Sequence, residues 1–514
     1  MDFSQTKSFF GPNKIVLWVS LIIVFAVGLA IRLYGLTDPP LDFQPTRQLH
    51  SALMARGMYY QNLQSVPAWQ RQMAVHQWKL EGLTEPPIME HLVAFSYQVM
   101  GGVYVWVARL YSTLFWILGG IALFLLVRDI SGSDGAIISL VYFFVLPYAA
   151  IASRAFQPDP LLTSLIVFSF WAMNRWYRRP SWGWAIATGA LSGAAIFTKS
   201  TAVFFIGGAL IGLMLVGKGL KNAVRDPKVW VIAALTIIPY GMFYYYGIYI
   251  SGQLASQFAL RFFPQLWIDP AWYIRWTDQI SGVVGFGWFL VGILGLLLLK
   301  DKTHRAMFMG VMLGYLVYGI TLDYHISTHD YYQLPLVPVI AIGIGVAAEL
   351  LLRNLRGPRW MLYPIVVGVV LFAMTMQGWD VRTTIKKTDA SSDPAFWETL
   401  GKRLGPDASV VGLTQDYGYR LEYYGWVIPD NWMTEGDMDY RALAGATFNI
   451  DKLFKQQTAG KQYFLVTMFS EFDAQTELKK ILYSGYPLVE KTDNYLLFDL
   501  QHPLPPGTVQ TPTQ

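Results

Sequence analysis

Long apolar stretches recur along most of this 514-residue chain and are separated by short polar connections. A helix that crosses the roughly 30 Å hydrocarbon core of a bilayer needs about 17 to 25 apolar residues. Eleven stretches of about that length predict spans at Ile15 to Leu36, Val103 to Val127, Gly135 to Ser153, Leu161 to Tyr177, Trp182 to Thr198, Ala202 to Val216, Val229 to Ile250, Ile280 to Leu299, Ala306 to Leu322, Leu334 to Leu352 and Trp360 to Met376. The pattern predicts a polytopic α-helical membrane protein.

The apolar pattern stops in two regions, which divide the chain. Residues 37–102 form a first loop longer than a connector needs, and loops of that length are usually functional. In it, Thr46 is expected to cap a helix from Arg47 to Leu63. We therefore predict a transmembrane domain over 1–378 that includes this loop, an α/β domain over 379–501 and a disordered tail over 502–514.

Alternating strand and helix patterns mark the C-terminal α/β domain. The predicted strands are Ser409 to Leu413, Tyr463 to Thr467 and Tyr495 to Phe498, and the predicted helices are Pro394 to Leu404, Tyr417 to Tyr424 and Glu471 to Leu482. No phosphate-loop or dinucleotide-binding motif occurs in this segment. We expect it to recognise an acceptor or to act as a lid.

Basic residues predict the orientation of the spans. Five short connections carry fourteen Lys and Arg residues, whereas the four short alternate connections carry four, namely Arg154, Lys199, Arg261 and Arg275. By the positive-inside rule, the fourteen mark the cytoplasmic side. An odd number of spans then places both the first long loop and the C-terminal domain outside, in a plasma membrane or bacterial inner membrane.

Composition narrows the chemistry. The chain is 54% hydrophobic and 14% charged, and its net charge of +5 follows the topology signal, so it gives no indication of nucleic-acid binding. It has no cysteine, which excludes disulfides, thiol catalysis and thiolate metal sites.

Ionisable side chains gather where the predicted outer loops meet the spans. They are Asp42 and Glu85 in the first loop, Arg109 in the second span, Arg154 and Asp159 before the fourth span, Lys199 between the fifth and sixth, and His325, His329 and Tyr331 before the tenth. Cations and acids at one level of a bundle suit an anionic lipid, because cations meet a phosphate and an acid accepts a proton.

Each of these residues also has a structural interpretation. Asp42 and Asp159 neighbour prolines and could cap turns or helices. Arg109 could extend to the membrane interface, and Lys199 could stabilise a helix C-terminus. The histidines and Glu85 could be ordinary loop residues.

Taken together, the order of these motifs resembles the GT-C glycosyltransferases. The motifs are an outer-loop Leu-Asp-Phe-Gln-Pro-Thr-Arg, a Glu-Pro-Pro, an Ala-Arg-Leu-Tyr-Ser helix, Arg-x4-Asp before the fourth span, Thr-Lys between the fifth and sixth, and His-Asp-Tyr-Tyr-Gln-Leu-Pro before the tenth. Within that superfamily the chain is most similar to the bacterial branch related to protein mannosyltransferases and aminoarabinose transferases. Many members have two adjacent acids in the first loop, whereas Asp42 is followed here by Phe43.

The resemblance implies inverting transfer of a sugar from a polyprenyl-phosphate donor to a lipid, glycan or protein acceptor. Asp42 would be the general base, and Arg154, Lys199 and His329 would hold the leaving phosphate, with Arg109 behind them. Asp159 would orient an acceptor, a cation or a divalent metal, although no cofactor is required. Glu85, His325 and Tyr331 are further candidates for the site.

Two alternatives belong to other classes. A lipid-linked sugar transporter or flippase would usually place ionisable groups near the bilayer midplane and show repeated halves, and neither feature is found in the sequence. A scaffold that presents its outer domain would tolerate exchange of the acids. Pocket shape selects the sugar and the acceptor, and the sequence pattern does not report it.

Overall fold

The computed structural model describes residues 8–255 and 261–505 and divides the chain into two compact units. The first comprises residues up to Thr37, Gly82–Met89 and Tyr104–Asp389. The second comprises Asp38–Glu81, Glu90–Val103 and the residues from Ala390 onward. The predicted tail lies partly outside the described residues, which end at 505.

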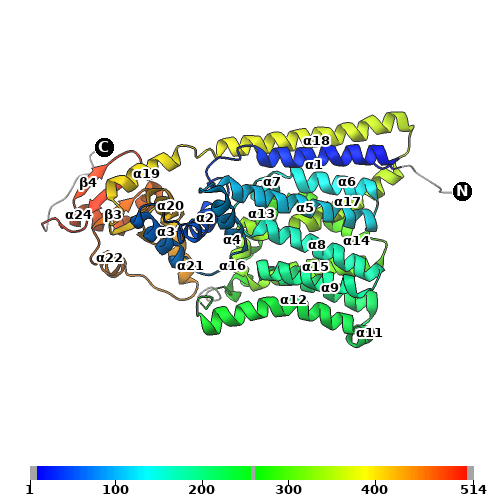
Figure 1. Ribbon diagram of the computed structural model, residues 1–514, viewed down its shortest axis with the longest axis horizontal. Coiled ribbons are helices and arrows are strands. Elements are labelled where there is room, and N and C mark those ends of the chain that lie inside the picture. The colour runs from blue at the N-terminus through cyan, green and yellow to red at the C-terminus, as the bar shows by residue number, and fades with distance from the viewer. Residues whose placement is uncertain (1–7, 256–260, 506–514) are drawn as a thin grey trace. The chain divides into compact units, whose positions relative to one another are not determined.

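The first unit is a bundle of helices (Figure 1). Its helices are α1 (Lys14–Leu33), α5 (Trp106–Ile130), α6 (Ser133–Val145), α7 (Pro147–Ala152), α8 (Asp159–Arg178), α9 (Trp182–Thr198), α10 (Ala202–Gly212), α11 (Leu220–Arg225), α12 (Pro227–Tyr245), α13 (Pro270–Val284), α14 (Phe286–Leu297), α15 (Lys302–Thr321), α16 (Asp323–Thr328), α17 (Leu336–Asn354) and α18 (Arg359–Lys387). The shorter segments are the π-helical η1 (Leu213–Lys218) and η2 (Tyr246–Ile250) and the 3₁₀ segments η4 (Pro264–Ile268) and η5 (Asp330–Gln333). Every predicted apolar stretch coincides with one or two of these helices.

Within the described residues, five helices are long and apolar enough to cross a membrane, by length and composition. They are α1, α5, the continuous helix Pro227–Ile250, α17 and α18. The bent pair α13 and α14 makes a sixth if it counts as one span. The other predicted stretches form shorter, interrupted or less apolar helices, such as α6, which ends before Pro147.

One predicted span is wrong as a continuous helix. The stretch Ile280 to Leu299 bends by 84° between α13 and α14. Gly285 lies at the break with φ of 77°, a conformation that glycine adopts without steric cost. The apolar pattern continues through this bend because hydrophobicity alone carries no information about backbone direction.

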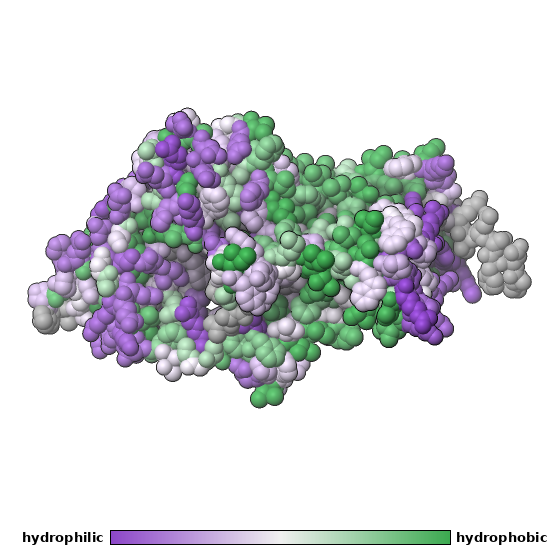
Figure 2. Space-filling model, turned by 60° about the horizontal axis from the view of Figure 1, so that its bottom comes forward, coloured by the Kyte–Doolittle hydropathy of each residue, from purple (hydrophilic) through white to green (hydrophobic). Residues whose placement is uncertain are grey.

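Large apolar side chains cover the outward face of the helical unit, as the hydrophobic surface in Figure 2 shows. Ile22 is 64% exposed, Ile237 64% and Phe372 66%. A water-soluble protein rarely leaves such a surface open, whereas a bilayer covers it. The protein is therefore an integral membrane protein.

Glycines bring several helices into direct backbone contact. A Cβ added to Gly208 on α10 would lie 2.1 Å from the Gly310 carbonyl oxygen on α15. A Cβ on Gly295 of α14 would lie 1.8 Å from the carbonyl oxygen of Gly343 on α17. Small residues of this kind are how spans associate in lipid, where no hydrophobic force drives them together.

Which ends of the spans face the cytoplasm stays a prediction. Cysteine labelling can test it, because the chain has no native cysteine and a single introduced cysteine would be the only labelled site. Ser181, which precedes α9, and Ser391, which precedes the C-terminal helix Asp393–Leu404, are both exposed. We expect an impermeant maleimide on intact cells to label Ser391→Cys and to label Ser181→Cys only after permeabilisation. Labelling of both on intact cells would contradict the predicted orientation.

The second unit combines the helices of the first loop with the C-terminal domain. The loop contributes α2 (Pro45–Tyr60), α3 (Ala68–Leu80) and most of α4 (Ile88–Met100). The C-terminal helices are α19 (Asp393–Leu404), η6 (Gln415–Gly418), α20 (Tyr419–Gly425), α21 (Glu435–Ala442), α22 (Ile450–Thr458), α23 (Phe469–Ala474) and α24 (Thr476–Gly485). The strands are β1 (Val410–Leu413), β2 (Pro429–Asn431), β3 (Tyr463–Val466), β4 (Leu488–Lys491) and β5 (Leu496–Asp499).

The strands form one sheet in the order β2-β1-β3-β5-β4. The β1 strand is parallel to β2 and β3, and β5 is antiparallel to β3 and β4. Val411, Phe464 and Phe498 from the three central strands are fully buried. The predicted small α/β domain is confirmed, and the three predicted strands are its central ones.

The start of the first loop helix differs from the prediction. Pro45 is its first residue, and Gln44 precedes it with φ of 45°. Thr46 therefore lies inside the first turn, where its hydroxyl donates to Asp416 Oδ1 at 3.3 Å. Proline at the first helical position has φ already fixed near the helical value and no N–H of its own to satisfy, and among the described residues no side chain caps this helix start.

Arg56 joins the loop helices to α20 inside the second unit. Its Nη2 donates to Gln77 Oε1 at 2.7 Å, and Gln77 Nε2 donates to the Glu422 carbonyl oxygen at 2.8 Å. The guanidinium also lies 4.0 Å from the Trp426 ring centroid, a cation–π distance. Burial and the nearby Glu81 carboxylate raise the pKa of Glu422 to about 8, so the Glu422 side chain is mostly protonated at neutral pH.

Candidate active site

An ion pair between Lys199 and Asp159 lies at the centre of the candidate site in the helical unit. Lys199 Nζ is 2.9 Å from Asp159 Oδ1 and 3.2 Å from Oδ2. Lys199 directly follows α9, and Asp159 is the first residue of α8, so two helix ends supply the pair. Both side chains are buried. A buried pair of this kind is strongly destabilised when one partner is removed.

The ion pair can be compared with the helix-capping roles that the sequence also allowed for Asp159 and Lys199. Asp159 was expected to be a possible helix cap, but the α8 N-terminus has no side-chain capping bond. Its carboxylate contacts Lys199 instead. Lys199 does occupy the C-cap position of α9, so it stabilises that helix end as well as holding Asp159.

Aromatic rings surround the Lys199 ammonium. Its Nζ lies 5.1 Å from the Tyr331 ring centroid and 5.6 Å from that of Tyr332. His329 contacts both tyrosine rings, at 5.7 and 5.8 Å between centroids. Arg261 Nη1 lies 3.5 Å from the Tyr332 hydroxyl. The structure thus brings together Lys199, Asp159, His329 and Tyr331.

His325 belongs to the same cluster but contributes no positive charge at neutral pH. Its ring stacks on Tyr332 at 5.5 Å and on His329 at 5.3 Å. Burial, together with the charges of Arg261 and His329, lowers the pKa of His325 to about 3. A neutral imidazole can orient neighbouring groups but cannot neutralise a phosphate.

Arg109 and Arg154 gather at a second point, the end of α1. Arg154 donates to the carbonyl oxygens of Tyr34 and Gly35, the latter at 2.6 Å. Arg109 donates to the same Gly35 oxygen at 2.9 Å. Gly35 has φ of 59°, which permits the turn there. Both arginines are buried and hold the segment from which the first loop departs. Phosphate binding by either remains a prediction.

Glu85 lies in the segment Gly82–Met89, which belongs to the helical unit. Its Oε2 accepts from Thr84 Oγ1 at 2.5 Å, and the side chain is partly buried. The role of Glu85 in the site stays a prediction.

Asp42 belongs to the second unit and is partly buried. Gln48 Nε2 donates to Asp42 Oδ1 at 3.2 Å and to the Phe43 carbonyl oxygen at 2.7 Å. Gln48 is fully buried on α2, so it fixes the loop around the carboxylate. Gln44 has a left-handed backbone two residues later, and such strain in a non-glycine residue often accompanies functional sites.

Sequence reasoning passed over several residues of the aromatic cluster. Tyr332 was quoted inside a motif without a role, and Arg261 was counted only as an outer basic residue. The consecutive Tyr331 and Tyr332 beside two histidines were a usable signal. The part of the chain that the structure describes contains no group of three or more His, Asp or Glu side chains suited to a metal ion.

Comparisons with known proteins bear on this arrangement. The family model for dolichyl-phosphate-mannose-protein mannosyltransferases matches residues 84–245. Among curated protein sequences, none matches the chain significantly.

Solved structures match over nearly the whole chain. ArnT from Cupriavidus metallidurans bound to undecaprenyl phosphate has a TM-score of 0.59 and 16% identity, covering 94% of this chain and 97% of that one. Its apo structure matches with a TM-score of 0.59, 17% identity and coverage of 95% and 98%. The archaeal oligosaccharyltransferase AglB from Archaeoglobus fulgidus, in complex with an inhibitory peptide and a dolichol-phosphate, matches with a TM-score of 0.54, 12% identity and coverage of 95% and 75%.

The fold is therefore that of ArnT and AglB. These matches and the mannosyltransferase family model confirm the predicted resemblance to the GT-C superfamily.

Proposed function

We propose that this protein transfers a sugar from a polyprenyl-phosphate-linked donor to a lipid, glycan or protein acceptor at the outer face of the membrane. The observation that carries the proposal is the near full-length fold match to ArnT, which was solved with undecaprenyl phosphate. AglB, which has the same fold, was solved with dolichol-phosphate and a peptide. Both structures thus hold a polyprenyl phosphate.

The site chemistry supports the same reaction. The acceptor hydroxyl would attack the anomeric carbon as Asp42 takes its proton. The bond between that carbon and the phosphate oxygen breaks, and the configuration inverts. The phosphate leaves with both electrons of the bond and needs cations in place of a proton. Lys199, aided by Arg261 and His329, would supply that charge, and no metal is obligatory in this scheme.

Asp159 would act by holding Lys199. Without the carboxylate, a buried ammonium would be costly and would lose its orientation. Tyr331 and Tyr332 limit the water around Lys199, which strengthens its attraction for an incoming phosphate. A transporter of lipid-linked sugars is the alternative, since it too would need to hold a phosphate.

A transfer assay separates the two functions. The purified protein, reconstituted in liposomes, is given a synthetic short-chain polyprenyl-phosphate sugar and an envelope-glycan extract as acceptor. We expect release of free polyprenyl phosphate, measured by mass spectrometry, in proportion to enzyme and acceptor. Movement of the intact donor across the liposome membrane, with no release of phosphate, would instead favour the transporter.

A further inference from the structure

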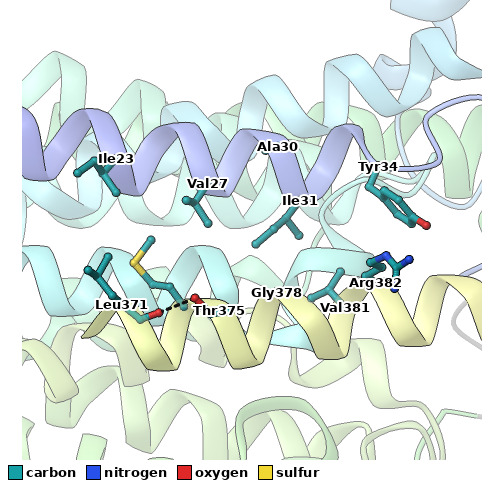
Figure 3. Close-up of a pocket in the computed structure, with 11 residues that line it drawn as sticks. Ile23, Val27, Ala30, Ile31, Tyr34, Leu371, Thr375, Gly378, Val381 and Arg382 are labelled. Atoms are coloured by element: carbon teal, nitrogen blue, oxygen red, sulfur yellow. Dashed lines mark hydrogen bonds between the residues drawn. The ribbon is translucent and has the colours of Figure 1, made fainter. Parts of the chain in front are cut away.

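A groove lies on the outside of the helical unit between α1 and α18 (Figure 3). It encloses about 380 Å³. Its lining residues are Ile23, Val27, Ala30 and Ile31 from α1 with Tyr34 directly after it, and Leu371, Met374, Thr375, Gly378, Val381 and Arg382 from α18. The spacing within each set is that of one helical face, so the two faces oppose each other along the groove.

The walls of the groove are apolar. The hydroxyl of Thr375 donates to the Leu371 carbonyl oxygen of its own helix at 2.9 Å, so it presents no unpaired donor to the groove. Ala30 and Gly378 are small and make room between the helices. A Cβ added to Gly378 would lie 3.6 Å from Ile31 Cδ1, which is an ordinary van der Waals contact with a side chain and no clash with backbone.

The polar atoms lie at one end. Figure 3 shows the Tyr34 phenol and the Arg382 guanidinium at the same end of the groove. Arg382 lies 4.9 Å from the Trp379 ring centroid, and Trp379 is 60% exposed. At 1.5 Å per residue, Arg382 lies roughly 35 Å along α18 from Arg359. That length spans the ~30 Å hydrocarbon core, so Arg382 and Trp379 reach the headgroup level.

The two helices have little protein around them. Only 11% of the most apolar part of α1 and 6% of that of α18 is buried, against 72% for α17. The medium that covers their outward faces is therefore lipid.

We propose that this groove is a binding site for an anionic phospholipid of the bilayer. Its acyl chain packs between α1 and α18, and its phosphate lies against Arg382 with the Tyr34 hydroxyl as a second donor. Inside the helix bundle, the buried Arg154 donates a hydrogen bond to the Tyr34 carbonyl oxygen, so the lipid and that arginine contact the same turn. Bound lipid stabilises the end of α1 and thus the start of the first loop.

Native mass spectrometry of the full-length protein tests this site. The protein is titrated with phosphatidylglycerol or with phosphatidylcholine of the same chains, and retained lipid is counted. We expect one phosphatidylglycerol to be retained preferentially and its affinity to fall about fivefold in Arg382→Gln. Gly378→Leu fills the groove without a backbone clash and should abolish retention of that lipid. Arg275→Gln, which removes an exposed arginine of α13, is the matched control and should retain it.

Thermal unfolding in detergent gives a second readout. Phosphatidylglycerol should raise the melting temperature of the native protein and of Arg275→Gln, but not of Arg382→Gln or Gly378→Leu. Equal retention of the two phospholipids, or an equal loss in Arg275→Gln, would overturn the proposal. Displacement of phosphatidylglycerol by undecaprenyl phosphate through the same two residues would also overturn it, because the groove would then serve the donor. The binding readout is independent of sugar transfer.

Discussion

Replacing Asp42 with Asn is expected to lower sugar transfer by about 10² or more without unfolding the protein. An amide is a very poor base, so it cannot take the proton of the acceptor hydroxyl. The structural contact survives, because Gln48 Nε2 donates to one oxygen of residue 42 and an Asn side chain keeps such an oxygen. The transfer assay with a polyprenyl-phosphate sugar measures the loss, and thermal unfolding measures stability.

Asp38→Asn provides the matched control. Asp38 is a second aspartate of the same loop, four residues earlier, and has no proposed role in the reaction. Its variant should transfer at nearly the native rate. Full activity in a stable Asp42→Asn protein would remove Asp42 as the base and move that role to Asp159.

The elements most visible in the sequence were those with a strong hydrophobic period. The apolar stretches coincide with helices, and β1, β3 and β5 were found because each is a short apolar run. The strands β2 and β4 were missed. β2 has three residues and begins with Pro429, and β4 alternates partly buried with exposed positions at one edge of the sheet. Edge strands bury less, so their sequences carry less signal.

The order of residues along the chain made Asp159 and Lys199 candidates for one site, but it did not predict which side chains contact each other. The sequence placed Asp159 and Lys199 at adjacent outer connections, which is why they were candidates for one site. That they pair with each other depends on how α8 and α9 pack, and no local pattern encodes it. The same holds for Arg109 and Arg154, whose shared partner is the Gly35 carbonyl.

Lys199→Gln is expected to have the second large effect, and it acts on both activity and stability. Loss of a charge-assisted contact to the leaving phosphate should slow transfer by about 10² to 10³. The variant also leaves Asp159 as a buried carboxylate without its cation, which costs about 3 to 5 kcal/mol of unfolding free energy. A loss of activity in this variant alone would therefore fit either a catalytic or a structural role.

The double variant Asp159→Asn with Lys199→Gln separates the two roles. It removes both charges and leaves two amides that can bond to each other, so stability should return to within about 1 to 2 kcal/mol of the native protein. If Lys199 only holds the helix ends together, transfer should recover along with stability. If it neutralises the leaving phosphate, transfer should stay low in a protein that unfolds at nearly the native temperature, and donor affinity should stay weak. Recovery of native transfer in the stable double variant would rule out Lys199 as the phosphate cation and leave Arg261 and His329 for that role.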